Sequence, residues 1–306
     1  MTTHFCWLFC IFTAFFPLVL GAETAFWVAS FNLENFYTHP SPTRPLKPQK
    51  SRLKVQESIL TLQPDVLAVQ EIGDAQSFSD LQSSLKFNGL HLPHAELVRG
   101  SDTNICLGIL SRFPITARRP HTNLHFFIDG HRFRMARGVA EVDLAVSPTY
   151  RFILLNAHLK SKRPIAEADE AEIREQEARQ LRRIIDRILT HKPGANVVVC
   201  GDFNDTPDSL TLRSLLGSGA GRLIDTRPEE MSGLDFLNRR PKASGSRATT
   251  WTHFYSKSDV YSRFDYILLS PGMAAEWSHG DALVLNSLDW GLASDHRPIM
   301  ARFIAP

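Results

Sequence analysis

Carboxylates, amides and imidazoles repeatedly stand at the ends of apolar, strand-like runs in this sequence. Glu71 follows VLAVQ, Asp202 follows VVVCG, and His158 comes shortly after ILL. The amides Asn32 and Asn204 occupy similar places, after ASF and GDF. Sheets of α/β proteins bind ligands at the edge where such strand ends gather. We therefore expect these residues to form one site.

This set of side chains fits metal-assisted phosphate chemistry. Mg²⁺ takes oxygen ligands, commonly one or two carboxylates together with water and substrate phosphate. An attacking water needs a base, and imidazole is the usual one near neutral pH. Amides and arginine stabilise the charge that develops on a phosphoryl group. Asp265, at the head of YILL, and the pair Asp295–His296, before RPIM, extend the set.

Each of these residues also has an ordinary structural explanation when it is taken singly. Asn32 could cap a turn, Glu71 could be a solvated strand end, and His158 could be a satisfied structural histidine. Asp265 could pair with a neighbouring arginine at the surface. For Glu34, a simple exposed acid fits as well as a functional role. The recurrence of such residues at strand ends is what favours a functional site.

The elements that must position these side chains follow from hydrophobic periodicity. Runs rich in Val, Ile, Leu and Phe predict strands at FWVASFNLENF, DVLAVQEI, NICLGILS, FRMARGVAEVDLAV, YRFILLNAHL, NVVVCGDFN and RFDYILLS. Residues 167–191 carry an apolar stripe at helical spacing and predict the clearest helix. Asp208 is expected to cap a helix that runs to Leu216, and residues 227–247 read as a polar surface excursion.

Strands and helices in this pattern do not alternate strictly, and some strands alternate apolar and polar residues while others are solidly apolar. The sequence therefore predicts an α/β fold in which two packed sheets carry helices on their outer faces, rather than a doubly wound parallel sheet. Hydrophobic content of 43% and charged content of 22% are ordinary for a globular domain. The formal net charge of +2 excludes an acidic tail protein and a histone-like basic protein.

The first 22 residues read as a secretory signal peptide, because the apolar run at residues 5–20 precedes Gly21 and Ala22 and carries no charge. Residues 23–306 are then one domain, exported to the periplasm or the extracellular space. The alternative is a membrane anchor formed by residues 5–20, but the run is shorter than the ~20 residues that a span needs. Cys106 and Cys200 remain in the mature chain, and burial as free thiols is favoured over a disulfide.

Seven motifs, FNLENF, VLAVQE, LGILSRFPI, NAHLKSK, GDFND, RFDYILLS and SDHRPI, extend over about residues 26–304. In these motifs and their order the sequence resembles the endonuclease/exonuclease/phosphatase superfamily, whose fold is deoxyribonuclease I-like. The resemblance implies a four-layer α/β sandwich, with two packed β-sheets flanked by helices. It also implies a divalent-metal-dependent phosphodiester hydrolase, with Mg²⁺ as the expected cofactor and Mn²⁺ or Ca²⁺ as alternatives.

The resemblance further implies roles for metal-binding and base residues by position. Asn32 and Glu71 resemble the metal-binding pair, and Asp295 resembles a second carboxylate near the metal. His296 resembles the general base or a phosphate-contacting imidazole. Asp265 resembles the carboxylate that orients this imidazole, as in a catalytic triad.

The remaining expected site residues handle the water and the phosphate. Asp202 resembles the residue that positions or deprotonates the attacking water, or that protonates the leaving group. Asn204 resembles the amide that holds the phosphate, and His158 resembles a second histidine that is a candidate general acid. Arg137 stands where a phosphate-contacting arginine is common, and Lys160 is expected to bind substrate beside it.

The motifs are common to enzymes that act on nucleic acids, inositol phosphates and phospholipid head groups. We therefore expect the flanking loops to determine the substrate. Residues 128–163 hold seven Lys or Arg against three acids, and residues 38–54 hold five and no acid. Basic loops beside the site suit DNA or RNA, although such stretches are also common as solvated surface. NAHLKSK and the helix after it resemble the secreted bacterial nuclease-like branch.

The sequence therefore predicts an exported nuclease that cuts DNA or RNA by in-line attack of water. We expect a monomer with no stable protein partner and no membrane insertion after signal cleavage. A phosphatase or phospholipase C-type enzyme of the same fold, acting on inositol phosphate or sphingomyelin, is the alternative. A non-catalytic binding module is disfavoured, because a dead copy need not keep the whole set of site residues.

Overall fold

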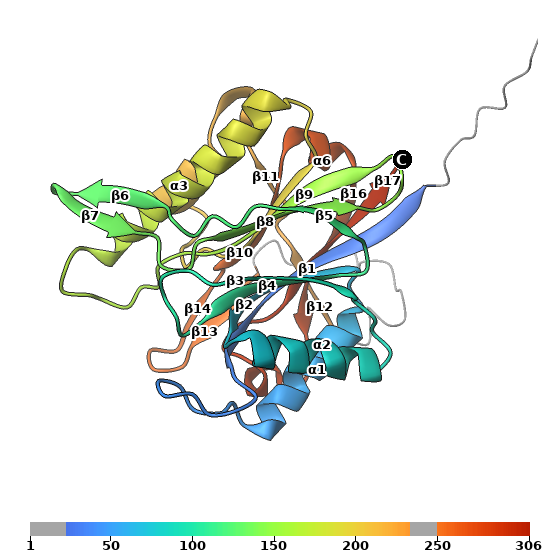
Figure 1. The fold of residues 1–306 in the computed structure, drawn as a ribbon, viewed down its shortest axis with the longest axis vertical. Coiled ribbons are helices and arrows are strands. Elements are labelled where there is room, and N and C mark those ends of the chain that lie inside the picture. Colours follow the sequence, from blue (N-terminus) through green and yellow to red (C-terminus); the bar gives the residue numbers. More distant parts are fainter. Residues whose placement is uncertain (1–22, 233–249) are drawn as a thin grey trace, which may run out of the picture.

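Two β-sheets lie face to face at the centre of the fold, with helices on both outer sides (Figure 1). The computed structural model describes residues 23–232 and 250–306. The predicted signal peptide, residues 1–22, lies outside the described residues, as does most of the polar excursion predicted at 227–247. In the described part of the chain, no helix is both long enough and apolar enough to cross a membrane.

Strands outnumber helices along the described chain. The strands are β1 (Thr24–Phe36), β2 (Val66–Ile72), β3 (His94–Val98), β4 (Cys106–Ser111), β5 (Ile115–Arg118), β6 (His125–Ile128), β7 (His131–Arg134), β8 (Val139–Ala145), β9 (Arg151–His158), β10 (Val197–Asp202), β11 (Ile224–Asp225), β12 (Glu229–Ser232), β13 (His253–Tyr255), β14 (Val260–Ser262), β15 (Asp265–Leu269), β16 (Trp277–Asn286) and β17 (Ile299–Ala305). The helices are α1 (Gln49–Leu62), α2 (Ala75–Phe87), α3 (Glu170–His191), α4 (Leu210–Leu216) and α6 (Pro271–Ala275), with 3-10 turns η1 (Gly219–Gly221) and η2 (Trp290–Leu292).

The layers of the fold follow from the sheet order and from where the apolar side chains meet. One sheet runs β12-β16-β17-β1-β2-β4-β3, and the other runs β11-β15-β10-β9-β8-β5. Side chains of both inner faces, among them Phe26, Val198 and Ile267, form the central core. Helices α1 and α2 cover the outer face of the first sheet, and α3 and α4 cover that of the second (Figure 1). The predicted four-layer α/β sandwich is confirmed.

The strands and helices next to the site form for local reasons that the sequence carries. Strand β10 is buried along its whole length, as an apolar run between two covered faces should be. Helix α3 turns Leu181 and Ile185 toward the second sheet. Asp169 caps α3 by accepting the backbone N–H of Ala171, which satisfies a donor that the first helical turn leaves free. The helix therefore begins at Glu170, slightly later than predicted.

The single strand predicted over FRMARGVAEVDLAV is wrong, because the chain turns in its middle. Strand β7 ends at Arg134 and β8 begins at Val139. Gly138 has a φ of 70°, and a Cβ at this position would lie 2.6 Å from the carbonyl oxygen of His121. A left-handed conformation with such a close approach requires glycine. The turn separates a protruding β6–β7 hairpin from the main sheet (Figure 1).

Two smaller expectations also have an outcome in the fold. The predicted cap of α4 is wrong by one residue, because the side chain of Ser209, not Asp208, accepts the backbone N–H of Leu212. The thiols of Cys106 and Cys200 are free, and both are buried. Burial of small apolar side chains is therefore the correct explanation of these two cysteines.

The strand register sets the predicted site residues side by side at one edge of the second sheet. Strand β10 lies between β9, to which it is parallel, and β15, to which it is antiparallel. Asp202, the last residue of β10, pairs with His158 on one side and with Asp265 on the other. In the first sheet, β1 and β2 run parallel and pair Asn32 with Gln70, directly before Glu71.

Candidate active site

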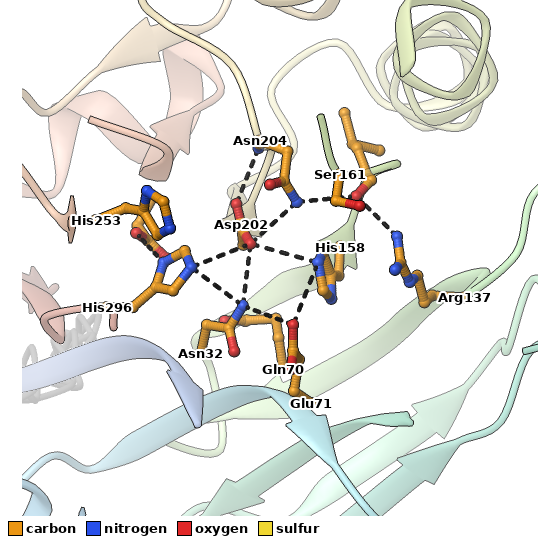
Figure 2. Close-up of polar contacts among 12 residues, drawn as sticks. Asn32, Gln70, Glu71, Arg137, His158, Ser161, Asp202, Asn204, His253 and His296 are labelled. Carbon is orange, nitrogen blue, oxygen red and sulfur yellow. Dashed lines mark hydrogen bonds and ion pairs between the residues drawn. The ribbon is translucent and has the colours of Figure 1, made fainter. Parts of the chain in front are cut away.

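Four buried side chains, three from strand ends and one from the segment before β17, form the base of a cleft between the two sheets. They are Asp202, His158, Asp265 and His296, none of them more than 5% exposed, and we call them the floor. Figure 2 shows Asp202 between the imidazoles of His158 and His296. The structure thus brings together residues that lie far apart in the sequence.

Asp202 is the centre of the floor and accepts most of its hydrogen bonds. Its Oδ1 accepts the backbone N–H of Asn204 at 2.9 Å, and its Oδ2 accepts the Nδ2 of Asn204 at 3.1 Å and of Asn32 at 3.0 Å. Burial raises the pKa of Asp202 to about 7, although the charge of His296 and these donors favour the ionised form. A carboxyl group with such a pKa can both take and release a proton near neutral pH.

His296 is held in one orientation by Asp265. Its Nδ1 lies 2.8 Å from Oδ2 of Asp265, and its Nε2 lies 3.6 Å from Oδ2 of Asp202. Burial opposes the charged imidazolium, but the carboxylates of Asp265 and Asp202 outweigh it and raise the pKa of His296 well above its usual range. The two predicted partners are therefore in contact, and the raised pKa favours the imidazolium form of His296.

His158 occupies the opposite side of Asp202 in a different protonation state. Its Nε2 lies 3.3 Å from Oδ2 of Asp202 and 3.9 Å from Oε1 of Glu71. Burial, together with the positive charges of Arg137 and His296, lowers the pKa of His158 well below its usual range. The structure thus places His158 beside Asp202 and Glu71, and its expected role as a general acid stays a prediction.

Glu71 and Asp295 are the carboxylates that remain accessible for a metal ion. The side chain of Glu71 is 19% exposed and that of Asp295 is 43% exposed. Burial and the nearby carboxylates of Asp295 and Glu71 raise the pKa of Glu34, although Lys47 opposes this shift. Glu34, Glu71 and Asp295 therefore lie near one another, and we call them the acidic face. Oxygen donors of this kind suit a hard divalent cation such as Mg²⁺.

Asn32 joins this acidic face to the floor. Its Nδ2 donates to Asp202 and lies 3.4 Å from Oε1 of Glu71, while its Oδ1 accepts the backbone N–H of Glu34 at 3.0 Å. The amide therefore presents nitrogen, not oxygen, to the carboxylates. In this arrangement Asn32 orients Glu71, and its expected role as a metal ligand stays a prediction.

Two buried amides link the sheets directly beneath the floor. Nε2 of Gln70 donates to Oδ1 of Asn156 at 2.7 Å, and Nδ2 of Asn156 donates to the carbonyl oxygens of Val69 and Gly108, each at 3.0 Å. Oε1 of Gln70 is buried without a hydrogen-bond partner, so this polar network is satisfied only in part. These hydrogen bonds nevertheless join the end of β2, which carries Glu71, to β9 beside the floor.

Several site residues have backbone conformations that are rare for residues other than glycine. Glu34, Asn35, Glu71 and Asn204 have φ values between 47° and 58°. In the described part of the chain, nine residues other than glycine have positive φ, so the site holds almost half of them. Strained backbone is typical of functional sites, where the surrounding structure imposes it.

Exposed residues border the cleft above the floor, and the cleft has a volume of about 730 Å³. Lys162, Arg163, Tyr255 and Lys257 form part of this border, and we call them the rim. Lys162 is 48% exposed and lies 3.2 Å from Asp205, and Tyr255 is 47% exposed. The rim thus offers ammonium and guanidinium groups beside an aromatic ring.

Three predicted substrate-contacting residues have distinct surroundings. Asn204 lines the cleft and donates to the carbonyl oxygen of Leu159 at 3.1 Å. Arg137 donates from Nη1 to the same oxygen at 3.0 Å, so Arg137 and Asn204 share one acceptor (Figure 2). Nζ of Lys160 instead donates to the backbone, including the carbonyl oxygen of Ser161 at 2.9 Å. The cleft is therefore bordered by the ammonium group of Lys162 rather than that of Lys160.

Sequence reasoning missed His253, which lies against the floor. Its ring centroid is 4.6 Å from that of His296 and 5.0 Å from that of Phe264, and its Nε2 lies 3.8 Å from Oδ2 of Asp295. Within the described residues, His253, Asp295 and His296 also form one of two groups whose donor atoms lie close enough together to hold a metal ion. No motif marks His253, because it reaches the site only through pairing of β13 beside His296.

The sequence and the fold of the chain resemble those of known proteins. The model of a family described as the endonuclease/exonuclease/phosphatase family matches residues 29–296. No curated protein matches the sequence significantly. Structures of this superfamily share the fold, and its members are generally hydrolytic and typically depend on divalent metals.

Solved structures resemble the chain over nearly its whole length. A truncated TDP2 from Caenorhabditis elegans is 18% identical, with a TM-score of 0.60, and the match covers 92% of this chain and 98% of that one. Sphingomyelinase C from Streptomyces griseocarneus is 18% identical, with a TM-score of 0.62 and coverage of 92% and 99%. An endonuclease/exonuclease/phosphatase family protein from Bacteroides thetaiotaomicron is 17% identical, with a TM-score of 0.58 and coverage of 93% and 99%.

Proposed function

The chain belongs to the endonuclease/exonuclease/phosphatase family, and from this premise we propose that it is a divalent-metal-dependent nuclease that hydrolyses phosphodiester bonds of DNA or RNA. The observation that carries the proposal is the geometry of the floor: Oδ2 of Asp202 lies 3.3 Å from Nε2 of His158 and 3.6 Å from Nε2 of His296, and burial raises the pKa of Asp202 to about 7. This arrangement supplies a base and a cationic hydrogen-bond donor in one buried site.

In the proposed reaction, water attacks phosphorus as the bond to the leaving oxygen breaks, Asp202 takes a proton of that water, and the leaving oxygen takes a proton from solvent. His158 and Asn204 orient the Asp202 carboxylate through the contacts of 3.3 Å and 3.1 Å. His296, fixed by Asp265, donates its Nε2–H to a phosphate oxygen on which negative charge grows. Hydrogen-bond donors aimed at developing charge in a water-poor site stabilise the transition state strongly.

In this proposal, residues of the acidic face bind the metal ion. Glu71 and Asp295 would hold a divalent cation, with Mg²⁺ first and Mn²⁺ or Ca²⁺ as alternatives, because their carboxylate oxygens are partly exposed beside the floor. When bound, such a cation neutralises charge on the phosphate and aligns it. Asn32 contributes by fixing the Glu71 carboxylate.

The rim favours a nucleic acid over a small phosphate ester. Lys162, Arg163 and Lys257 offer positive charge to a phosphodiester backbone. Tyr255 offers a half-exposed ring on which a base can stack. A chain of nucleotides uses both kinds of contact along its length, whereas an inositol phosphate uses only the first.

The direct test is a substrate panel for the protein from residue 23 onward. Plasmid DNA, single-stranded DNA, RNA, sphingomyelin and inositol phosphates are each incubated with Mg²⁺, Mn²⁺ or Ca²⁺, and with EDTA. We expect cleavage of at least one nucleic acid with a divalent cation and none with EDTA. Activity that persists in EDTA would overturn the metal requirement, and turnover of sphingomyelin or inositol phosphate alone would overturn the nuclease.

A phospholipase C-type enzyme is the second candidate, because apolar side chains lie exposed just before Asp295. Leu288 is 89% exposed and Leu292 is 43% exposed. One structure with the same fold is a sphingomyelinase C. Hydrolysis of sphingomyelin in vesicles that is lost in Leu288→Asp would favour this candidate.

Export and a monomeric state complete the proposal. The apolar run at residues 5–20 and the small residues after it support a cleaved signal peptide. N-terminal sequencing of the protein secreted by a bacterial host tests this, with Glu23 near the expected first residue. Retention of residues 5–20 in a membrane fraction would indicate an anchor instead.

A further inference from the structure

The buried carboxylate of Glu177 has no role in the proposed reaction. It lies beside the loops that carry Arg137 and Lys160. Glu177 is on α3 and is 1% exposed. Its Oε2 accepts the backbone N–H of Lys160 at 2.6 Å, and its Oε1 accepts the backbone N–H of Ala136 at 3.3 Å. A buried charge is costly unless it is hydrogen-bonded, so two backbone amides from two different loops account for its presence here.

Helix α3 also holds the loop of Lys160 with a second side chain, that of Arg174, one turn earlier. Arg174 is 2% exposed, and its Nη1 donates to the carbonyl oxygen of Lys160 at 3.2 Å. Its Nε donates to Oδ2 of Asp205 at 3.2 Å. Residues three apart on a helix lie on one face. Glu177 and Arg174 therefore hold the N–H and the C=O of Lys160 from one rigid element.

The loops that Glu177 joins carry Arg137, the expected phosphate-contacting arginine, and Leu159, whose carbonyl oxygen this arginine contacts. Arg137 directly follows Ala136, and Leu159 directly precedes Lys160. The carbonyl oxygen of Leu159 accepts Nη1 of Arg137 at 3.0 Å and Nδ2 of Asn204 at 3.1 Å. The two backbone N–H groups that donate to Glu177 thus belong to the residues next to Arg137 and Leu159 in the sequence.

The peptide of Ala136 is fixed on its other side as well. Its carbonyl oxygen accepts the backbone N–H of Asp102 at 2.8 Å. Oδ2 of Asp102 lies 3.9 Å from Nε of Arg137. With the carbonyl of Ala136 held by one loop and its N–H held by Glu177, the two peptide planes that flank Ala136 have little freedom to rotate, and the direction in which Arg137 leaves the backbone is set.

We propose that Glu177 is a positioning residue, which fixes Arg137 against the Leu159 carbonyl that Asn204 shares, so that a phosphate meets a preoriented guanidinium group. The proposal rests on the proposed phosphodiesterase function. Misplacement of a substrate-contacting group by about 1 Å can cost about a hundredfold in rate. The carboxylate is suited to this task because both of its oxygens accept, whereas an amide side chain has one acceptor and one donor.

The test compares Glu177→Gln with Glu172→Gln, an exposed glutamate on the same helix. We expect Glu177→Gln to lower kcat/KM for bis(p-nitrophenyl) phosphate by about 10- to 100-fold, and Glu172→Gln to leave it within about twofold. Thermal unfolding of both variants establishes that they are folded. A folded Glu177→Gln variant with the kcat/KM of the wild type overturns the proposal.

A double-mutant cycle separates positioning from a general loss of structure. In an Arg137→Ala background, Glu177→Gln should lower kcat/KM by less than about threefold, because the group it positions is already absent. A purely structural role predicts the same factor in both backgrounds. Equal factors therefore overturn the proposal even if Glu177→Gln is impaired.

Amide hydrogen exchange gives a readout that needs no activity. Glu177→Gln should speed exchange at the backbone amides of Ala136 and Lys160, and Glu172→Gln should not. If the wild type cleaves no phosphodiester, the proposed function fails while this readout still tests the loop alignment. Unchanged exchange at both amides overturns the alignment whatever the substrate is.

Discussion

The floor and the rim of the cleft differ in burial and in the elements that carry them. The floor, Asp202, His158, Asp265 and His296, comes from strand ends and the segment before β17, and its side chains are buried and paired with one another. The rim, Lys162, Arg163, Tyr255 and Lys257, comes from a loop and a hairpin and is largely exposed. Strand register fixes the floor whatever the substrate is, whereas rim side chains can change without disturbing the core. The difference separates chemistry from substrate choice.

The sharpest test of the floor is Asp202→Asn, which keeps the shape and removes the base. We expect kcat to fall by about a thousandfold on every substrate, because general-base catalysis contributes about 10²–10⁴-fold. The measurement is initial rates on plasmid DNA and on bis(p-nitrophenyl) phosphate. Asp208→Asn, at an exposed aspartate, is the control. A variant that keeps a tenth of the activity on either substrate would show that Asp202 is not the base.

The next largest effect is expected for Asp265→Asn, through His296. The Asp265 carboxylate helps raise the pKa of His296 against its burial, so the imidazolium persists to high pH and is lost only as pH rises through that raised value. Without the carboxylate the pKa of His296 falls, and the alkaline limb of kcat/KM should move to lower pH. The rate at the optimum should drop about a hundredfold.

A pH–rate profile from about pH 5 to about pH 10 measures the Asp265→Asn effect. Both the small ester and plasmid DNA should give the same displacement, since the floor serves every substrate. If the alkaline limb of kcat/KM does not move, another group determines it, and His296 is not the group that must be protonated.

The smallest effect is expected at the rim, and it should depend on the substrate. The double variant Lys162→Ala/Arg163→Ala should raise KM for plasmid DNA about tenfold, and each phosphate that is no longer neutralised should make the slope of log affinity against log salt shallower by about one. For bis(p-nitrophenyl) phosphate the change should be much smaller. Arg183→Ala, at an exposed arginine of α3, is the control. Equal losses on both substrates would erase the distinction between floor and rim.

How much the sequence predicts differs between these regions for a physical reason. Asp202, His158 and Asp265 stand at the ends of apolar strands, so periodicity places them at one sheet edge, and register does the rest. His253 and Glu177 escape this logic. His253 arrives on a short hairpin that only tertiary packing places beside His296, and Glu177 reads as one more acid in a charged helix until its backbone partners are seen.

Local rules also failed where one residue decides the outcome. The turn at Gly138 divides a continuous β-like pattern, because backbone proximity to His121 matters more there than side-chain propensity. The layers were predictable from motif order and apolar runs, since burial on two faces leaves few arrangements. The orientation of the Asn32 amide was not, because it depends on which neighbour donates to its oxygen.

The left-handed backbone at Glu34, Asn35, Glu71 and Asn204 has a consequence for protein engineering. Each such residue costs about 1–3 kcal/mol, and glycine would adopt the same conformation without that cost. A laboratory evolution experiment that rewards heat resistance alone should therefore accumulate glycine at these four positions. The resulting enzymes would survive higher temperatures and lose turnover, so any programme to thermostabilise this scaffold should hold these positions constant and draw its gains from the outer helices.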